Sequence, residues 1–302
     1  MAYFVALDGG GTKTQCWVAD EEKVLGKAAG GSVKLSVVDE GTATTRLQEL
    51  VREAAREAGI ELSAVTRTCM GLAGISSELV RAWADTTLRK VVGGEVLLLG
   101  DEEIAFEAAF AGGAGVLVIA GTGSNVMGRC ADGRRFTAGG WGPMLGDEGS
   151  GHWIGVEAIK AGLRAQDRGV ATCLLSEIEK HWGLDGLGAL VAWGNSRTRV
   201  EFAGLTTVVA ACAEGGDALA AAVLERAGVE LAEQVGLVAS KMHQAGCAAG
   251  DALRVAFTGS VLDKIPRVRR SMEAALVAGH PWVVMAETAV LPLEGALWRA
   301  RG

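Results

Sequence analysis

The 302-residue sequence lacks a long apolar run and a dense basic segment, and each absence excludes a class of protein. No stretch reaches the roughly 18 consecutive apolar residues that a membrane span needs. The N-terminal apolar run, Tyr3 to Leu7, stops at Asp8 and is too short for a signal-peptide core. We therefore expect a cytoplasmic protein without a membrane partner. A net charge of −7 and the lack of a Lys/Arg-rich block argue against nucleic acid as a partner.

Paired cysteine spacings are also missing. The six cysteines are scattered along the chain, as Cys16, Cys69, Cys130, Cys173, Cys212 and Cys247. Without a Cys-x-x-Cys pair they indicate neither a zinc site nor a disulfide framework, so we expect reduced and mostly buried thiols. The P-loop motif GxxxxGK[ST] is absent, which excludes a P-loop NTPase. The GxSxG motif is also absent, which excludes the nucleophile elbow of an α/β-hydrolase.

What remains is the composition of a folded protein large enough for two domains. Hydrophobic residues make up 49% and charged residues 22% of the chain. A chain of this length exceeds the size at which one core usually stops growing, so a cleft between domains is expected. The glycine-rich joint 112–115, placed between a predicted helix and a new apolar strand, predicts the domain boundary.

The order of predicted strands and helices is that of an α/β protein, and each half of the chain begins with the same pattern of strand, glycine turn and strand. Strand-like runs on either side of a glycine turn open the chain, and a second strand, turn and strand follow the joint, which suggests a degenerate internal duplication. The predicted strands are 3–7, 15–19, 67–72, 95–99, 116–120, 126–129, 253–257 and 282–286. The predicted helices are 44–58, 78–89, 105–110, 153–166, 171–182, 217–245 and 292–299.

The first glycine turn has the composition of a phosphate-binding loop. Its glycines let backbone N–H groups approach a polyphosphate, while hydroxyls and one lysine add donors and positive charge. The residues concerned are Gly10, Gly11, Thr12, Lys13 and Thr14. Asp8, at the end of the preceding strand, suits a hydrated Mg²⁺ ion. An ordinary glycine-rich hairpin turn is the alternative.

A second such turn lies in the restarted half, at Gly121, Thr122, Gly123 and Ser124. Two turns of this kind, one in each half, would hold the phosphates of one nucleotide, which makes a nucleotide-binding function the better interpretation. Between them, Asp101 follows a predicted strand. A carboxylate there can accept the proton of an attacking hydroxyl, or it can cap the next helix, or both.

The most distinctive segment is 139–154, which combines glycines with one acidic pair and two tryptophans. Such a segment makes a poor core but a good rigid loop, able to offer backbone amides and carboxylates to a polar ligand at the start of a helix. We take Gly139, Gly140 and the pair Asp147 and Glu148 as candidate ligand-binding residues. An acidic capping cluster is the alternative.

Together these motifs resemble the actin, hexokinase and Hsp70-like ATPases, and within them the N-acetylglucosamine kinase and BadF-type ATPase family. The family patterns DGGGTKT, GTGSN and GGWG with LGDEGSxxWIG stand here at residues 8–14, 121–125, 139–142 and 145–155. The resemblance runs from Ala6 to Ala296. It implies an α/β fold of two ribonuclease H-like domains with a nucleotide cleft between them.

The resemblance also implies roles. The N-terminal domain would comprise residues 1–112 with the helix 292–302 packed back onto it, and the C-terminal domain residues 113–291. Asp101 would be the catalytic base, Asp147 would bind sugar hydroxyls, and Gly139 and Gly140 would pack against the sugar. Gly259 and Ser260 would form the adenosine turn. ATP and Mg²⁺ are the implied cofactors, and we expect a homodimer.

The expected function is transfer of the γ-phosphoryl group of ATP to the 6-hydroxyl of an amino sugar, first of all N-acetylglucosamine. Relatives usually have an asparagine after the first hairpin, where this chain has Lys34, so Lys34 either meets an anionic or differently substituted sugar or is an exposed loop lysine. Glucosamine and N-acetylmuramic acid are therefore alternative acceptors. Two further functions stay open: a BadF-type activator ATPase with a shared iron–sulfur cluster, and a sugar or nucleotide sensor without turnover.

Overall fold

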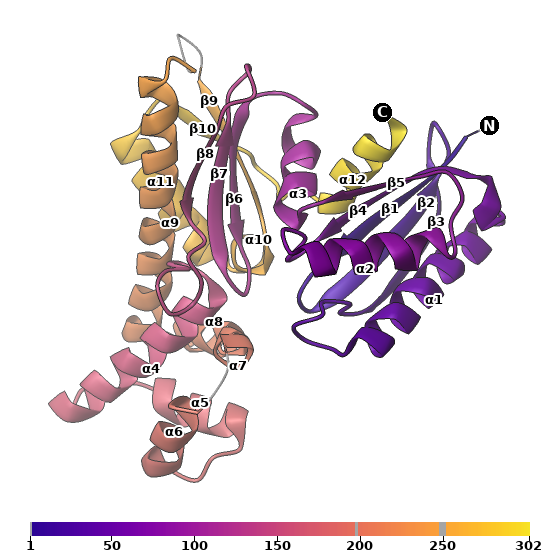
Figure 1. Ribbon diagram of the computed structural model, residues 1–302. Helices are drawn as coiled ribbons and strands as arrows, with labels where there is room; N and C mark the ends of the chain where they lie inside the picture. The colour runs from indigo at the N-terminus through magenta and orange to yellow at the C-terminus, as the bar shows by residue number, and fades with distance from the viewer. Residues whose placement is uncertain (1, 197–198, 248–251) are drawn as a thin grey trace. The chain divides into compact units, whose positions relative to one another are not determined.

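The structure, a computed structural model, describes residues 2–196, 199–247 and 252–302. It divides into two compact units, Met1–Gly112 with Val290–Gly302, and Gly113–Ala289. Each unit has its own five-stranded sheet with flanking helices, coloured indigo to violet for most of the first unit in Figure 1. The expected α/β class is confirmed.

The first unit contains a mixed sheet in the order β3-β2-β1-β4-β5. Its strands are β1 (Tyr3–Gly9), β2 (Lys13–Ala19), β3 (Val24–Gly31), β4 (Val65–Leu72) and β5 (Glu95–Leu99). Its helices are α1 (Glu40–Ala58), the short η1 (Leu62–Ala64), α2 (Glu78–Arg89), α3 (Asp101–Phe110) and α12 (Pro292–Arg301). The β1–β4 and β4–β5 pairs are parallel, and the others are antiparallel.

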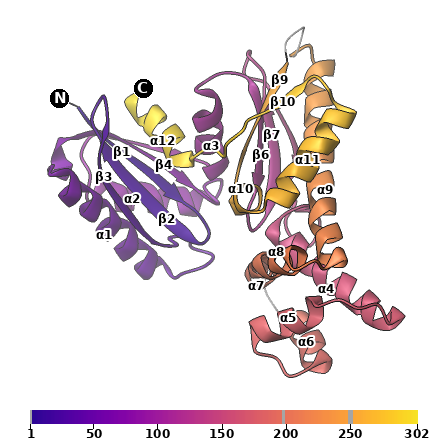
Figure 2. The ribbon, with the colours of Figure 1, turned by 180° about the vertical axis from the view of Figure 1, so that it is seen from behind.

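Strand β1 is buried on both faces, as its apolar sequence requires. Val5 and Leu7 belong to the core formed with α1 and α2, whereas Phe4 and Ala6 belong to the core formed with α3 and α12. Figure 2 shows α12, the C-terminal helix, against this second face. Gly295 allows that contact, because an added Cβ would overlap the backbone of α3 at Ile104.

The second unit repeats the topology, with the sheet order β10-β9-β6-β7-β8. Its strands are β6 (Gly115–Ala120), β7 (Ser124–Arg129), β8 (Arg135–Gly139), β9 (Leu253–Thr258) and β10 (Val283–Met285). Its helices are α4 (Gly151–Arg168), α5 (Leu174–Trp182), α6 (Leu187–Gly194), α7 (Arg199–Gly204), α8 (Thr206–Glu214), α9 (Ala218–Gln244), α10 (Ser260–Lys264) and α11 (Pro266–Gly279). Parallel and antiparallel pairs follow the same sequence as in the first sheet, so the suspected duplication is confirmed at the level of topology.

The cysteine prediction was wrong. Cys130, after β7, and Cys247, after α9, form a disulfide with Cα atoms 5.3 Å apart. The two residues are 117 positions apart in sequence, so no local spacing announces the bond. The other four cysteines are free. Disulfides are rare in cytosolic proteins, so this bond does not favour the cytoplasmic expectation. Within the described ranges, no helix is both long and apolar enough to cross a bilayer.

Candidate active site

In the first unit, two acidic residues follow neighbouring parallel strands at one edge of the sheet. Asp8 pairs with Gly71 of β4, and Gly71 pairs with Leu99 of β5, two residues before Asp101. Burial, followed by the negative charge of Asp101, raises the pKa of Asp8 from 3.8 to about 6, while Lys13 opposes the shift. The carboxylates of Asp8 and Asp101 are thus close enough to interact.

Asp101 is not the cap of the helix that follows it, which removes one of the two roles considered above. Gly100 is the N-cap of α3, its N–H donates to Glu103 Oε2 at 3.0 Å, and Asp101 is the first helical residue. Burial, then the charge of Asp101 and a hydrogen bond with it, raise the pKa of Glu102. Asp101 therefore has two acidic neighbours with which it interacts, Asp8 and Glu102.

The Asp8 carboxylate fits a hydrated Mg²⁺ ion. Two carboxylates that repel each other at a partly buried edge gain most from a divalent cation, which would favour the ionised form of Asp8. Magnesium usually keeps several of its waters, so one or two carboxylates suffice to hold it.

Asp8 makes the stability of the unliganded protein depend on pH. Because the folded pKa of about 6 exceeds the ordinary 3.8, the cost of ionising buried Asp8 is absent below pH 4 and grows as the pH rises through 6. We expect Asp8→Asn to raise the free energy of unfolding by up to about 3 kcal/mol at pH 7.5 and to have little effect at pH 4. Urea unfolding at both pH values measures this. Exposed Glu61→Gln is the control, and an equal gain at both pH values would contradict the assignment.

The first glycine turn is accessible except for its last side chain. Gly10 N–H donates to Lys13 O at 3.1 Å, and residues 11–13 are exposed. Thr14 is fully buried, and its hydroxyl has no hydrogen-bond partner among the described residues. The turn therefore presents backbone groups, Thr12 and Lys13 to solvent, but not the Thr14 hydroxyl.

The segment that contains Lys34 is fastened to this turn. Ser32 Oγ donates to Gly10 O at 3.1 Å and accepts from Lys34 N, while Arg46 Nη1 donates to Ser32 O at 2.9 Å. Neither Lys34 nor Arg46 forms a salt bridge with an acidic residue in the described parts of the chain. The backbone of Lys34 and the guanidinium of Arg46 thus both bond to Ser32, and among the described residues neither cation has a carboxylate partner.

In the second unit, the Gly121–Ser124 turn and the turn at Gly259 and Ser260 lie at the carboxyl ends of neighbouring parallel strands. Ile119 of β6 pairs with Thr258 of β9. Gly121 N–H donates to Gly123 O at 2.9 Å, and this hydrogen bond closes the Gly121–Ser124 turn. Gly259 has a φ of 100°, and an added Cβ would overlap the backbone of Ala120, so only glycine fits this approach.

The distinctive segment is hydrogen-bonded directly to that glycine turn. Gly151 N–H donates to Gly121 O at 2.8 Å, and His152 N–H donates to Thr122 O at 3.2 Å. Ser124 Oγ donates to the carbonyl oxygen of Glu148 at 2.8 Å. Two motifs that the sequence separates are therefore one structural unit.

Asp147 lies at the centre of this union. It is 3% exposed and has a φ of 61°, a left-handed conformation that aspartate tolerates better than most residues. A Cβ at Gly123 would be 2.8 Å from Asp147 Oδ2, so the carboxylate lies against the glycine turn. Gly142 N–H donates to its Oδ1 at 3.2 Å.

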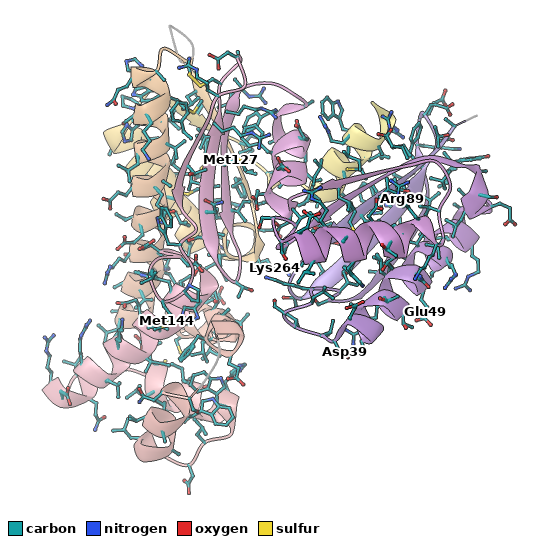
Figure 3. All side chains as sticks on the ribbon, viewed as in Figure 1. Asp39, Glu49, Arg89, Met127, Met144 and Lys264 are labelled. Carbon is teal, nitrogen blue, oxygen red and sulfur yellow. A yellow bond between two sulfur atoms is a disulfide. The ribbon has the colours of Figure 1, made fainter. Side chains whose placement is uncertain are left out.

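Gly139 and Gly140 lead into the loop with φ values of 74° and 73°. Added Cβ atoms would meet the side chains of Gln234 and Asn125 respectively. Gln234 was missed from the sequence: its Nε2 donates to the Glu148 carboxylate at 3.3 Å, and its Oε1 is buried without a partner among the described atoms. A buried glutamine in the apolar helix α9 was the available signal. Three apolar residues of the loop, Trp141, Met144 and Leu145, are exposed, and Met144 is labelled in Figure 3.

Two sheets of this topology, each with a glycine turn at the carboxyl edge of its parallel strands, define an actin-like ATPase fold. The family and the kinase relatives described next place the chain among ATP-dependent phosphotransferases of the sugar-kinase type. The chain belongs to the BadF/BadG/BcrA/BcrD ATPase family, whose model matches residues 5–289.

Curated relatives include an N-acetylmuramic acid/N-acetylglucosamine kinase from Clostridium acetobutylicum, 33% identical over 76% of this chain and 77% of that protein. A glucosamine kinase from Vibrio cholerae is 26% identical over 88% of this chain and 87% of its own length. A solved structure of a candidate N-acetylglucosamine kinase from Chromobacterium violaceum has a TM-score of 0.77 at 27% identity and covers 98% of both chains.

Proposed function

We propose that this protein transfers the γ-phosphoryl group of ATP to the 6-hydroxyl of an amino sugar, with N-acetylglucosamine as the first choice. The observation that carries the proposal is the hydrogen-bonded union of the Gly121–Ser124 turn with the segment that contains Asp147. A phosphate-type turn and a rigid acidic loop held in contact suit a reaction that joins a nucleotide to a polyhydroxy acceptor. The named activities of the two kinase relatives support the same reaction.

The roles follow from the chemistry of each group. Asp101 would accept the proton of the sugar hydroxyl, because it follows β5 at the carboxyl edge of the parallel strands, where it interacts with Asp8. Residues 10–13 and 121–124 would bind phosphates, with Thr14 limited to its backbone, and Gly259 and Ser260 would contact adenosine. Gly139, Gly140, Asp147 and Glu148 would bind the sugar. Asp8 would hold a hydrated Mg²⁺ ion, which neutralises charge on the phosphates when bound.

N-acetylmuramic acid is a second candidate acceptor, because one observation favours it. This sugar differs from N-acetylglucosamine by an ether-linked carboxylate. Lys34 and Arg46 are two cations without a salt-bridge partner in the described ranges, fastened by Ser32 to the first glycine turn. A carboxylate is the kind of group that such a pair binds.

Lys34→Asn should therefore change the choice of sugar. Loss of one charged hydrogen bond to the carboxylate is expected to lower kcat/KM for N-acetylmuramic acid about tenfold or more relative to N-acetylglucosamine. The measurement is the ratio of the two kcat/KM values, with exposed Lys23→Asn on the same hairpin as the control. If the ratio of the two kcat/KM values stays the same in both variants, Lys34 does not contribute to the choice of sugar.

The function itself is tested by a panel of acceptors. ADP release with Mg²⁺ should require a sugar and should be fastest with N-acetylglucosamine, N-acetylmuramic acid or glucosamine, ahead of glucose. ATP hydrolysis independent of any sugar would instead favour the activator ATPase. That function needs cysteines that are free to ligate a cluster, and Cys130 is engaged in a disulfide.

A further inference from the structure

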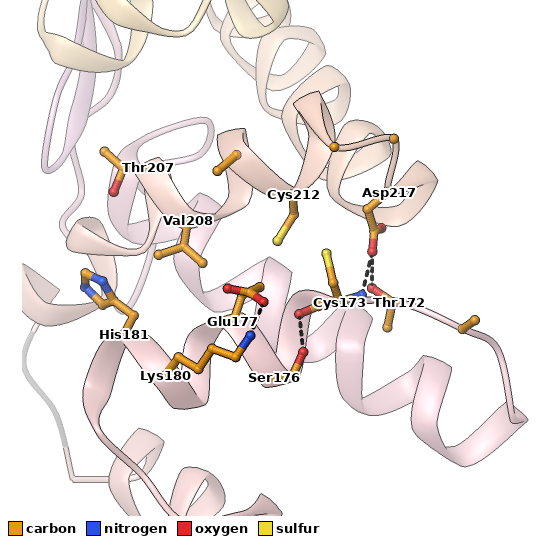
Figure 4. A pocket seen from close by; sticks show the side chains of 14 residues that line it. Thr172, Cys173, Ser176, Glu177, Lys180, His181, Thr207, Val208, Cys212 and Asp217 are labelled. Carbon is orange, nitrogen blue, oxygen red and sulfur yellow. Dashed lines mark hydrogen bonds and ion pairs between the residues drawn. The ribbon is translucent and has the colours of Figure 1, made fainter.

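Apart from the candidate active site, the second unit contains a large cavity. It has a volume of about 1060 Å³ and is lined by α5, α8 and the segment before α9 (Figure 4). None of the residues assigned above to ATP, metal or sugar lines it. Its polar lining includes Cys173, Glu177, Lys180, Cys212 and Asp217.

Two of these residues are thiols that face each other. Cys173 is the N-cap of α5 and is half-buried, whereas Cys212 lies on α8 and is 5% exposed. The two thiols interact electrostatically, and Figure 4 shows their sulfur atoms near one another at the cavity. The pair is free, although Cys130 and Cys247 are bonded.

The other charged groups of the cavity are engaged, and one of them holds Cys173 in place. Glu177 pairs with Lys180 at 2.6 Å. Asp217 Oδ2 accepts from Thr172 Oγ1 at 2.7 Å and from Cys173 N–H at 2.8 Å. Although burial opposes it, hydrogen bonds led by that from Ala220 N–H lower the pKa of Asp217 to about 2. Asp217 thus stays ionised and keeps the backbone of Cys173 fixed opposite Cys212.

Helix α8 connects the thiols to the glycine turn of the candidate active site. Its first residue, Thr206, shares its single hydroxyl proton between Ala203 O at 2.8 Å and Gly151 O at 3.3 Å, as a bifurcated hydrogen bond. Gly151 N–H in turn donates to Gly121 O at 2.8 Å. Two hydrogen bonds in series thus connect the first residue of α8 to the Gly121–Ser124 turn.

We propose that Cys173 and Cys212 are a reversible oxidation site, and that the disulfide between them lowers the affinity for nucleotide by drawing α8 toward α5. Disulfide formation between the two cysteines is inferred from the geometry of the cavity alone. The effect of the disulfide on nucleotide affinity rests on the proposed function of the Gly121–Ser124 turn.

The oxidant is a hydroperoxide. Its terminal oxygen is transferred to the sulfur of Cys173, giving a sulfenic acid and releasing an alcohol, or water from hydrogen peroxide. The sulfur of Cys212 then attacks that of Cys173, the S–S bond forms, and the hydroxyl leaves as water with the thiol proton. Burial, then the hydrogen bond to Cys173, raises the pKa of Cys212 to about 12, so the more exposed Cys173 reacts first.

The test uses the purified full chain and diamide, a thiol-specific oxidant that leaves exposed Met144 unchanged. We expect a cross-link between the tryptic peptides that contain Cys173 and Cys212, with the loss of two hydrogens. The dissociation constant of ADP, measured by titration calorimetry, should rise at least about fivefold and return with dithiothreitol. Cys173→Ser and Cys212→Ala should bind ADP equally before and after diamide. Cys69→Ser, at a buried free cysteine of the first unit, should respond like the parent protein.

The controls separate this proposal from other causes. Cys173→Ser retains the Cys130–Cys247 bond, so an effect of dithiothreitol through that bond would also appear in this variant. Absence of the cross-link overturns the proposal, as does a cross-link that leaves the dissociation constant unchanged. If the reduced protein binds no ADP at all, the proposed function fails, and the cross-link still reports separately on the thiol pair.

Discussion

Asp101→Asn is expected to lower kcat by about a hundred to ten thousandfold, because that is the usual contribution of a general base. The substitution removes the acceptor for the proton of the sugar hydroxyl and keeps nearly the same shape at the first position of α3. Sugar and nucleotide should still bind, since neither contact depends on proton transfer. Steady-state kinetics give kcat, and calorimetric titration gives both dissociation constants.

Glu102→Gln is the matched control for this variant. A glutamine amide keeps the length of the Glu102 side chain and can still donate a hydrogen bond to Asp101, so the kcat of this variant should fall far less. An Asp101→Asn variant with a rate near that of the parent would remove Asp101 from the mechanism. Equal losses in both variants would point to the acidic cluster as a whole rather than to one base.

Asp147→Ala should reduce kcat/KM for every sugar to a similar extent. A hydrogen bond to a charged group contributes about 1.5–3 kcal/mol, which corresponds to roughly a ten- to hundredfold loss. The carboxylate also lies against Gly123 and accepts from Gly142 N–H, so its removal should loosen the contact between the loop and the glycine turn. The measurement is kcat/KM across the amino sugars and glucose.

Because Asp147 has a positive φ, a second variant is needed to separate loss of the carboxylate from backbone strain. Alanine at a φ of 61° is strained, whereas glycine is not, so Asp147→Gly removes the carboxylate without that strain. Similar losses in the alanine and glycine variants assign the effect to the carboxylate. A loss confined to one sugar would contradict a general role in binding hydroxyls, and full activity of the glycine variant would assign the effect to strain.

Elements with strong local patterns could be predicted from the sequence. Helix α2 and strand β5 have the bounds expected, because apolar spacing marks both and Gly100 directly follows β5. Strand β3 was missed because glycine and alanine fill most of its second half, and in this topology it is an edge strand whose pairing depends on β2.

The motifs of the candidate site were likewise visible in the sequence, but not their contacts. Gly121–Ser124 and Asp147 were named separately, and their union depends on backbone hydrogen bonds that residue types do not encode. The Cys130–Cys247 bond and the Cys173–Cys212 pair were also unpredictable, because helices α8 and α9 bring distant residues together. Thr14 was predicted to bind phosphate as part of its motif, but its side chain is buried in the structure.

The central claim is transfer of phosphate to the 6-hydroxyl of an amino sugar, and ³¹P NMR of the product tests it most directly. The protein is incubated with ATP, Mg²⁺ and N-acetylglucosamine until ADP accumulates. The account predicts one mole of phosphate ester for each mole of ADP formed. Its ³¹P signal should be split by the two protons of a CH₂ group, as a 6-phosphate requires. Release of inorganic phosphate in amounts equal to ADP, with no ester signal, would contradict it.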